Sequence, residues 1–261
     1  MSEYPVREDQ IQFYETNGYV KLDDVLTLVE VEELRAALEV AVEDRKRRDK
    51  LAGPIQDPNY EKVFLQMVNL WETYPQIKKY VFGKRIAEIA RRLSRSNFVR
   101  LWHDHALIKR PQDSSATAWH QDLPYWPMKE SIALSCWMAL DDVGLDNGCM
   151  HFIPGSHNFG RLDPVDLINP QNLFNILPEA KNKKFEPVAV SLKAGSCTFH
   201  NGLTFHYAGP NKTDRPRRAM VTIYMPAGIT YMHVPHIVGD RANLKEGQEF
   251  EGELFPILAQ G

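Results

Sequence analysis

The spacing of hydrophobic positions changes once along the chain. In the N-terminal part, apolar residues recur every three or four positions, as on one face of a helix. The clearest run follows Thr27, which forms a capping-box pattern with Glu30, and its apolar face is Val31, Leu34, Leu38 and Ala41. We therefore predict that a helix begins at Thr27. Similar signals predict helices over 8–17 and 83–94 and a strand over 18–22.

From Phe98 onward the apolar positions form short extended runs separated by Pro, Gly, Asp and Asn. These runs predict strands over 98–110, 116–122, 131–140, 149–153, 187–192, 196–200, 203–207 and 217–225. Many short strands with such punctuation are typical of a sandwich or barrel. We therefore predict a mainly β (α+β) protein whose core is a double-stranded β-helix, the cupin-like jelly roll, supported by N-terminal helices.

A chain of 261 residues, 43% of them hydrophobic, can bury a substantial core within one domain. We predict a single domain over 1–261 with helical support over about 8–97, a jelly-roll core over about 98–227 and a C-terminal tail over 228–261. The segment 158–184 is too long for a tight connection, so we expect an insertion over one end of the barrel. Such loops often act as lids.

His120 and Asp122 stand two residues apart in a predicted strand, and at that spacing two side chains leave a strand on the same face. A second imidazole from a distant strand, for which His206 is the candidate, would complete a 2-His-1-carboxylate set. Such a set holds Fe(II) and leaves coordination positions open for other ligands. The sequence therefore indicates a metal site with His120, Asp122 and His206 as ligands.

An arginine in the predicted strand after His206 can hold a carboxylate with two parallel hydrogen bonds. Arg215, Arg217 and Arg218 all stand near the start of this strand, and strand alternation separates the last two. Arg217 shares its face with the apolar set Ala219, Val221 and Ile223, which suits a barrel interior. Arg218 shares the other face, with Met220, Thr222 and Tyr224. We assign the carboxylate-binding role to Arg217.

The chain resembles the phytanoyl-CoA dioxygenase family of Fe(II)/2-oxoglutarate oxygenases. The resemblance extends from about Gln10 to Pro226 and rests on these motifs, in order: His120-Gln121-Asp122-Leu123 with Tyr125 and Trp126, Trp137-Met138-Ala139-Leu140-Asp141-Asp142, Asn147-Gly148-Cys149 with Pro154-Gly155-Ser156-His157, and His206 with Gly209, Asn211 and Arg217. It implies an enzyme, a 2-oxoglutarate-dependent dioxygenase that uses Fe(II), 2-oxoglutarate and O2. His120, Asp122 and His206 would be its catalytic iron ligands, and Arg217 would hold the distal carboxylate of 2-oxoglutarate.

The resemblance also places Trp137, Ala106 and Gln66 beside 2-oxoglutarate. By strand alternation, Trp102 and Asp104 share the face of Ala106, so we expect both on the substrate side of the cavity. We expect the same of Tyr125. The family often has a hydroxyl two residues after the distal histidine, where this chain has Ala208. One hydrogen bond to 2-oxoglutarate is therefore expected to be missing.

Other histidines compete for the metal. His103 and His105 form a His-x-His pair of the kind that begins cupin metal sites, although no Glu follows at short range. His200 ends an apolar run much like that of His206, and the turn and arginine after His206 decide in favour of His206. His233 and His236 are expected to be exposed loop histidines, with a place near the barrel mouth as the alternative.

The expected activity is oxidation, in the first place hydroxylation, of a small organic metabolite with release of succinate and CO2. The same iron site also supports desaturation, cyclisation or endoperoxidation of a natural-product intermediate. A catalytically silent, metal-binding cupin-like protein is the alternative from another class. Halogenases on this scaffold have a small residue in place of the carboxylate, a position that Asp122 fills, so we predict hydroxylase-type chemistry.

Charge and composition exclude several other classes. The formal net charge of −3 argues against nucleic-acid binding, and no stretch approaches the ~18 apolar residues of a membrane span. The three cysteines, Cys136, Cys149 and Cys197, form no C-x-x-C pair, which fits a reducing compartment. We expect a cytoplasmic protein whose partner is a small-molecule substrate, with no nucleic acid and no membrane. The oligomeric state stays open.

Overall fold

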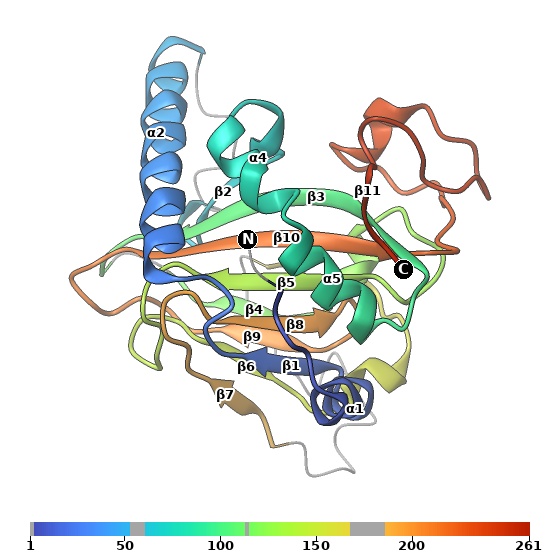
Figure 1. Ribbon diagram of the computed structural model, residues 1–261. Coiled ribbons are helices and arrows are strands. Elements are labelled where there is room, and N and C mark those ends of the chain that lie inside the picture. Colours follow the sequence, from blue (N-terminus) through green and yellow to red (C-terminus); the bar gives the residue numbers. More distant parts are fainter. Residues whose placement is uncertain (1–2, 53–60, 113–114, 168–185) are drawn as a thin grey trace.

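Two antiparallel sheets form the centre of the fold in the computed structural model, which describes residues 3–52, 61–112, 115–167 and 186–261 (Figure 1). The larger sheet has the order β1 (Tyr19–Leu22), β8 (Cys197–Asn201), β5 (Leu134–Ala139), β10 (Arg217–Pro226), β3 (Phe98–Lys109) and β11 (Ile257–Gln260), with β2 (Leu65–Val68) also paired with β3. The smaller sheet has the order β4 (Thr117–His120), β9 (His206–Ala208), β6 (Met150–Phe152) and β7 (Val188–Val190). This mainly antiparallel, jelly-roll-like fold confirms the predicted fold class.

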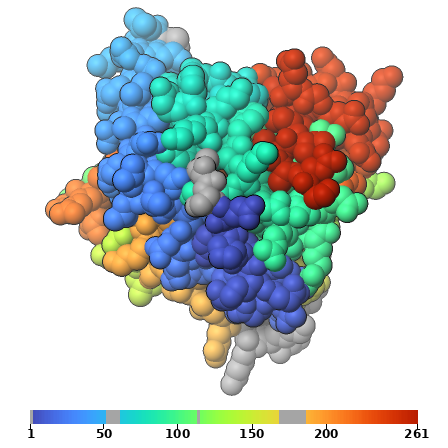
Figure 2. All heavy atoms as spheres, in the orientation of Figure 1, coloured from blue at the N-terminus to red at the C-terminus, as the bar shows by residue number. Residues whose placement is uncertain are grey.

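Helices pack against one face of the larger sheet. The α-helices are α1 (Glu8–Asn17), α2 (Leu28–Ala52), α4 (Pro75–Val81) and α5 (Lys84–Leu93), and short 3-10 turns are η1 (Leu70–Glu72), η2 (Leu123–Tyr125), η3 (Ser156–Phe159) and η5 (Gly239–Ala242). α4 and α5 lie across the sheet, and the space-filling view shows the N-terminal helices and the C-terminal segment covering this side (Figures 1 and 2). The predicted N-terminal support is therefore present, whereas α4 and β11 were not predicted.

Local sequence signals account for where two of the helices begin or end. At the start of α2, the Glu30 amide donates to Thr27 Oγ1 at 3.3 Å and the Thr27 amide donates to Glu30 Oε2 at 2.8 Å, which confirms the capping box. α1 ends at Gly18, whose φ of 77° is in the left-handed region. A Cβ there would lie 2.4 Å from His157 Nδ1 and 2.5 Å from Thr204 Oγ1, so only glycine fits.

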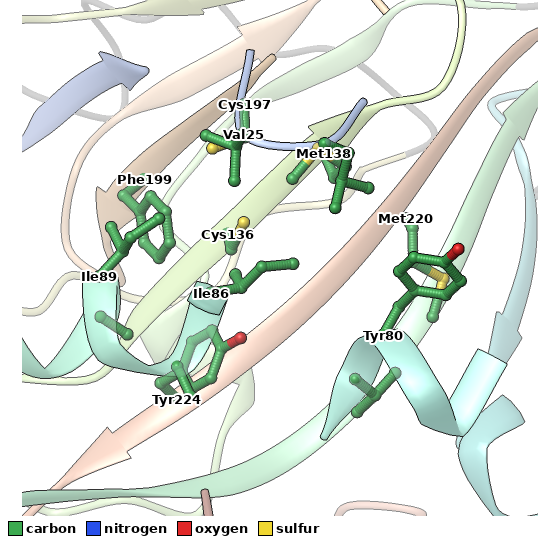
Figure 3. Close-up of a cluster of buried hydrophobic side chains, with 14 of the residues drawn as sticks. Val25, Tyr80, Ile86, Ile89, Cys136, Met138, Cys197, Phe199, Met220 and Tyr224 are labelled. Atoms are coloured by element: carbon green, nitrogen blue, oxygen red, sulfur yellow. The ribbon is translucent and has the colours of Figure 1, made fainter. Parts of the chain in front are cut away.

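Residues alternate between the two faces of the larger sheet. Cys136, Met138, Phe199, Met220 and Tyr224 face the helices, where they pack with Val25, Tyr80, Ile86 and Ile89 (Figure 3). The residues between them face the space between the two sheets, among them Trp137, Ala139, Ala219, Val221 and Ile223. One sheet face therefore builds the core, and the other is available for a site.

The residues of β3 also alternate between the two faces, but the face that points inward is not the one predicted. In its pairing with β10, Ala106 lies opposite Met220 and Asp104 opposite Thr222, whereas His105 lies opposite Val221. Directly paired residues of antiparallel strands share a face, so Ala106 and Asp104 point toward the helices. The prediction of an inward Ala106, which rested on the family resemblance, is wrong. Strand alternation extended this error to Asp104, because alternation fixes which residues share a face but not which face is interior.

Asp104 stabilises the fold instead of lining a cavity. Its carboxylate is fully buried and accepts hydrogen bonds from the amides of Leu70, at 3.0 Å, and Trp71, at 3.2 Å. Burial raises the pKa of Asp104 to about 7, against the effect of these hydrogen bonds. Asp104 therefore connects β3 to η1, and its predicted contact with substrate is wrong.

Trp102 lies at an irregularity of β3. The register with β10 shifts between Ile223 and Tyr224, which pair with His103 and Leu101 and leave Trp102 without a direct partner. The indole is fully buried, stacks on Phe255 with ring centroids 5.4 Å apart, and is not among the described residues that line the main cavity. The prediction that Trp102 faces the substrate is also wrong.

The segment predicted as a C-terminal tail, 228–261, is built into the fold. β11 pairs with β3 at the edge of the larger sheet, and Tyr231 bridges to Met128. The loop between Tyr231 and η5 brings His236 and Ile237 into the lining of the main cavity. No helix in the described part of the chain is both long enough and apolar enough to cross a membrane.

We expect Asp104→Ala to lower the free energy of unfolding by ~1–3 kcal/mol, because two amides of the η1 turn lose their buried acceptor. The folded pKa of about 7 exceeds the ordinary value of 3.8, so the folded state binds this proton more tightly than the unfolded state. This contribution is complete below about pH 4 and is lost as the pH rises through about 7. The difference from wild type should therefore be larger at pH 5 than at pH 8.

Urea unfolding at both pH values measures this difference. The exposed Asp214, replaced by Ala, is the matched control and should change the unfolding free energy little. Equal unfolding free energies for the wild type and Asp104→Ala would show that the buried carboxylate does not stabilise η1.

Candidate active site

His120 and His206 are direct partners across the smaller sheet. They pair in the register of β4 with β9, and their ring centroids lie 4.1 Å apart. The prediction that Asp122 lies on the strand with His120 is wrong. β4 ends at His120, and Asp122 is the residue that precedes η2, with helical dihedral angles (φ −77°, ψ −43°). Even so, Asp122 Oδ1 lies 3.5 Å from Nε2 of each histidine. The pairing of β4 with β9 brings the two histidines together, and a turn, not strand alternation, adds Asp122.

Backbone carbonyls orient both imidazoles. Nδ1 of His120 lies 2.7 Å from the Ala118 carbonyl oxygen, and Nδ1 of His206 lies 2.9 Å from that of Thr204. Each Nδ1–H donates to its carbonyl, which leaves the lone pair of Nε2 directed toward Asp122. Burial, followed by the nearby His120, lowers the pKa of His206 well below its ordinary value, so His206 is neutral and able to bind a cation.

Asp122 is held as an ionised carboxylate. Its Oδ2 accepts hydrogen bonds from Ser135 Oγ and His200 Nε2, both at 3.1 Å. Burial raises its pKa, but His206, His120 and His200 together lower the pKa well below the ordinary value. With Oδ2 engaged, Oδ1 is the oxygen that faces His120 and His206. The rival His200 thus lies beside the cluster and orients its carboxylate.

Within the part of the chain that the structure describes, His120, Asp122 and His206 are the one group whose ligand atoms lie close enough, within 4.8 Å of one another, to hold a metal ion. Two imidazoles and one carboxylate are the donors that non-heme iron prefers. His103 and His105 do not belong to this group. The geometry therefore fits the predicted ligand set.

The three residues open into a cavity of about 250 Å³ between the two sheets. Arg217 also lines it and is almost completely buried, with its guanidinium 5.0 Å from the ring centre of Trp137. Its buried Nε and Nη1 atoms have no hydrogen-bond partner among the described residues. Burial lowers the pKa of Arg217 to about 10. Unpaired buried donors are costly, so this arrangement fits an anion that accepts from Arg217.

Arg218 points away from the cavity. Its side chain donates to both carboxylate oxygens of Asp141, at 2.8 and 3.1 Å, and to Glu39 at 3.0 Å. The apolar face that Arg217 shares with Val221 and Ile223 lies inward. The predicted orientation of the two arginines is confirmed.

Lys109 lies directly opposite Arg217 in the pairing of β3 with β10, which no pattern in the sequence indicated. Its Nζ donates to the carbonyls of Val63, at 3.1 Å, and Ser115, at 2.6 Å. Burial, together with repulsion from Arg217, lowers the pKa of Lys109 to about 6. Of this pair, Arg217 is therefore the side chain that is fully charged at neutral pH, whereas Lys109 is mostly neutral.

The structure divides the other predicted site residues into two sets. Trp137, Gln66 and Tyr125 line the cavity, whereas Ala106, Trp102 and Asp104 do not. The cavity lining also contains His103, His105 and His236, whose role the sequence did not reveal. His233 is exposed as predicted, but His236 is half-buried, so the prediction of an exposed loop histidine is wrong for His236.

The predicted insertion, 158–184, can be followed only to Leu167, and its remainder lies outside the described residues. Its first part is connected by hydrogen bonds to the loop that carries Asp122. Gln121 Nε2 donates to the Gly160 carbonyl at 2.8 Å, and the Tyr125 hydroxyl donates to the Val165 carbonyl at 2.6 Å. Leu167 then reaches the cavity lining.

Two facing antiparallel sheets enclose one cavity that contains the His–Asp–His cluster and a buried arginine, as the resemblance to the Fe(II)/2-oxoglutarate oxygenases implied. The family model for phytanoyl-CoA dioxygenase (PhyH) matches residues 14–219, and the chain belongs to this family. Among curated relatives, the peroxisomal phytanoyl-CoA dioxygenase of Bos taurus is 25% identical over 252 residues, which cover 87% of this chain and 70% of that protein.

Two solved structures match nearly the whole chain. The non-heme α-ketoglutarate-dependent carbocyclase SnoK from nogalamycin biosynthesis is 31% identical, with a TM-score of 0.82 and 97% of each chain covered. The epimerase SnoN, in complex with Fe3+, α-ketoglutarate and nogalamycin RO, is 30% identical, with a TM-score of 0.76 and coverage of 97% of this chain and 98% of that one.

Proposed function

We propose that this protein is an Fe(II)- and 2-oxoglutarate-dependent dioxygenase that oxidises a small organic metabolite with release of succinate and CO2. The observation that carries the proposal is the combination, in one cavity, of three convergent metal donors with a buried arginine whose Nε and Nη1 have no partner among the described residues. A protein that only bound a metal would have no need for the second feature. The family membership of the chain supports the same activity.

His120, Asp122 and His206 would hold the iron. Three protein donors would leave coordination positions open for other ligands. Bound Fe(II) and 2-oxoglutarate supply the oxidising chemistry, in which O2 is consumed and 2-oxoglutarate is converted to succinate and CO2. The protein fixes the donor atoms: carbonyls hold the two imidazoles, and Ser135 and His200 hold the carboxylate.

Arg217 would bind the distal carboxylate of 2-oxoglutarate through its planar pair of donors. Trp137 packs against the guanidinium, and Gln66 contributes an amide to the same lining. Ala208 also lines the cavity but has no hydroxyl group. Thr117, which pairs directly with Ala208 across β4 and β9, lines the same cavity and has a hydroxyl group. We infer that Thr117 offers the hydrogen bond for which Ala208 has no group.

A second outcome of the same site is favoured by the two structural relatives, a carbocyclase and an epimerase. Removal of a hydrogen from the substrate need not end in hydroxylation. Ring closure or inversion of a stereocentre on a natural-product intermediate is therefore the second candidate function. Analysis of the product mass separates the two, because hydroxylation adds one oxygen atom, epimerisation leaves the mass unchanged and oxidative ring closure removes two hydrogen atoms.

We expect the wild type to form succinate from 2-oxoglutarate in the presence of Fe(II) and a panel of candidate metabolites. Asp122→Ala should lower this activity and the affinity for iron by more than about 100-fold, and His200→Leu should weaken iron binding by about 10–100-fold by releasing the carboxylate. The exposed His233→Ala is the control. If the wild type binds iron but forms no succinate with any metabolite, the proposed activity is refuted in favour of a catalytically silent, metal-binding protein.

We expect Arg217→Ala to weaken 2-oxoglutarate binding about a hundredfold or more, because each charged hydrogen bond contributes ~1.5–3 kcal/mol. Arg217→Lys should also be costly, since an ammonium lacks the planar fork. The matched control is Arg218→Ala, which removes a neighbouring guanidinium that already pairs with Asp141. Anaerobic titration of 2-oxoglutarate into the iron-loaded variants measures this, and weaker binding to Arg218→Ala than to Arg217→Ala would refute the assignment.

We expect no halogenated product from the unmodified protein. Asp122 would fill the coordination position that a halide needs, and Ser135 and His200 hold its carboxylate by hydrogen bonds. Reactions run in chloride and in bromide should therefore give the same product by mass spectrometry. A product containing halogen would overturn the placement of Asp122 on the metal.

A further inference from the structure

Three histidines outside the metal cluster line the same cavity. His103 and His105 lie on the inner face of β3, and His236 comes from the loop before η5. The rings of His103 and His105 have centroids 5.2 Å apart, and those of His103 and His236 are stacked at 5.4 Å. We refer to His103, His105 and His236 as the histidine wall.

The hydrogen bond that each ring makes through Nδ1 determines whether its Nε2 is a donor or an acceptor. The Val238 amide donates to Nδ1 of His236 at 3.1 Å, so the proton of this neutral ring is on Nε2. Nδ1 of His103 lies 3.3 Å from the Asp104 carbonyl and 3.5 Å from Nδ1 of His105, which places a proton on Nδ1 of His103 and the lone pair on Nδ1 of His105.

The wall therefore offers donors and an acceptor together. Nε2–H of His105 and of His236 are donors, and Nε2 of His103 is an acceptor. None of the three Nε2 atoms has a partner among the described residues, and none is sealed from the cavity. Burial is the main reason that the pKa of His103 lies well below its ordinary value and that those of His105 and His236 are about 4. All three rings are neutral at pH 7.

Aromatic packing fixes the wall in place. Trp102 lies behind it, with its ring centroid 4.9 Å from that of His236 and 5.6 Å from that of His103. The indole is supported in turn by Phe250 and Phe255. Trp102 thus acts on the cavity through the histidines that it supports.

The charge of the lining restricts what the wall can bind. Among the described lining residues, Arg217 is the one Lys or Arg, and Asp122 is the one carboxylate. The proposed function engages both, so no described lining cation remains for a phosphate or carboxylate of the substrate. The other lining residues include the apolar side chains Val68, Leu107, Trp126 and Ile237, which suit an apolar ring body.

We propose that His103, His105 and His236 form a subsite for an uncharged hydroxyl group, an alcohol or a phenol, carried on an apolar ring body. A hydroxyl both donates and accepts, and it therefore matches a wall with an acceptor at His103 and donors at His105 and His236. A carboxylate can only accept and would face the lone pair of His103. That this ligand is the substrate rests on the proposed function.

The test uses three probes of similar shape: 2-naphthol, naphthalene and 2-naphthoate. Equilibrium dialysis measures their binding to the full chain, both without additions and with Fe(II) and 2-oxoglutarate under anaerobic conditions. We expect 2-naphthol to bind the wild type about tenfold more tightly than naphthalene in both conditions, as one or two neutral hydrogen bonds allow. The comparison with 2-naphthoate is made with 2-oxoglutarate bound, because the Arg217 guanidinium would otherwise attract its carboxylate. In that condition 2-naphthol should bind more tightly than 2-naphthoate.

Substitutions of the histidines test whether these residues cause the preference for 2-naphthol. His105→Leu and His236→Leu should each lower 2-naphthol affinity about three- to tenfold and leave naphthalene unchanged. His236→Gln, which keeps a donor near the position of Nε2, should retain most of the preference. His233→Leu, three residues from His236 in an exposed position, is the matched control. Folding is checked by the 2-oxoglutarate affinity of each variant, which should stay within about twofold of wild type.

The outcomes separate the subsite from the proposed function. No binding of 2-naphthol, equal affinity for 2-naphthol and naphthalene, tightest binding of 2-naphthoate while 2-oxoglutarate is bound, or an unchanged preference in the leucine variants would each overturn the subsite. A wild type that prefers 2-naphthol but binds neither iron nor 2-oxoglutarate would overturn the proposed function and leave the subsite in place.

Discussion

The site depends on keeping one carboxylate ionised inside the barrel. A buried carboxylate is stable only when its charge is matched by hydrogen-bond donors or by a cation. Asp122 receives hydrogen bonds from Ser135 and His200 on one oxygen and turns the other toward His120 and His206. Ser135 and His200 belong to the larger sheet, whereas His120 and His206 belong to the smaller sheet, so the His–Asp–His cluster is complete only where the two sheets face each other.

The second constraint is the opposite charge on Arg217. The guanidinium is buried beside Trp137 and directly opposite Lys109, and no described carboxylate forms an ion pair with it. An anion bound there would satisfy the two unpaired donors of Arg217. It would also offset the repulsion from Arg217 which, after burial, lowers the pKa of Lys109. The cavity therefore has a cation-binding group and an anion-binding group in one lining, which is the requirement for a metal ion chelated by a dicarboxylate.

β3 shows how one strand serves both stability and recognition. Its outward residues include Asp104, which holds η1, and its inward residues include His103 and His105, which line the cavity. Substitutions at adjacent positions are thus expected to have different effects, one on unfolding and the other on ligand preference. The irregularity at Trp102 adds an aromatic support for the histidines at the end of the strand where the C-terminal loop returns.

Local patterns in the sequence determined the capping of α2, most strands of both sheets and the inward face of β10, and the residue types together with the family resemblance identified the His–Asp–His cluster. These features depend on short-range spacing or on residue types whose chemistry has few alternatives. Tertiary structure alone decided the face of β3, because alternation does not say which side is interior. It also decided the position of Asp122 in a turn, the pairing of Lys109 with Arg217, and the arrival of His236 from a segment predicted as a tail. Each of these depends on contacts between residues far apart in the chain, which no local spacing encodes.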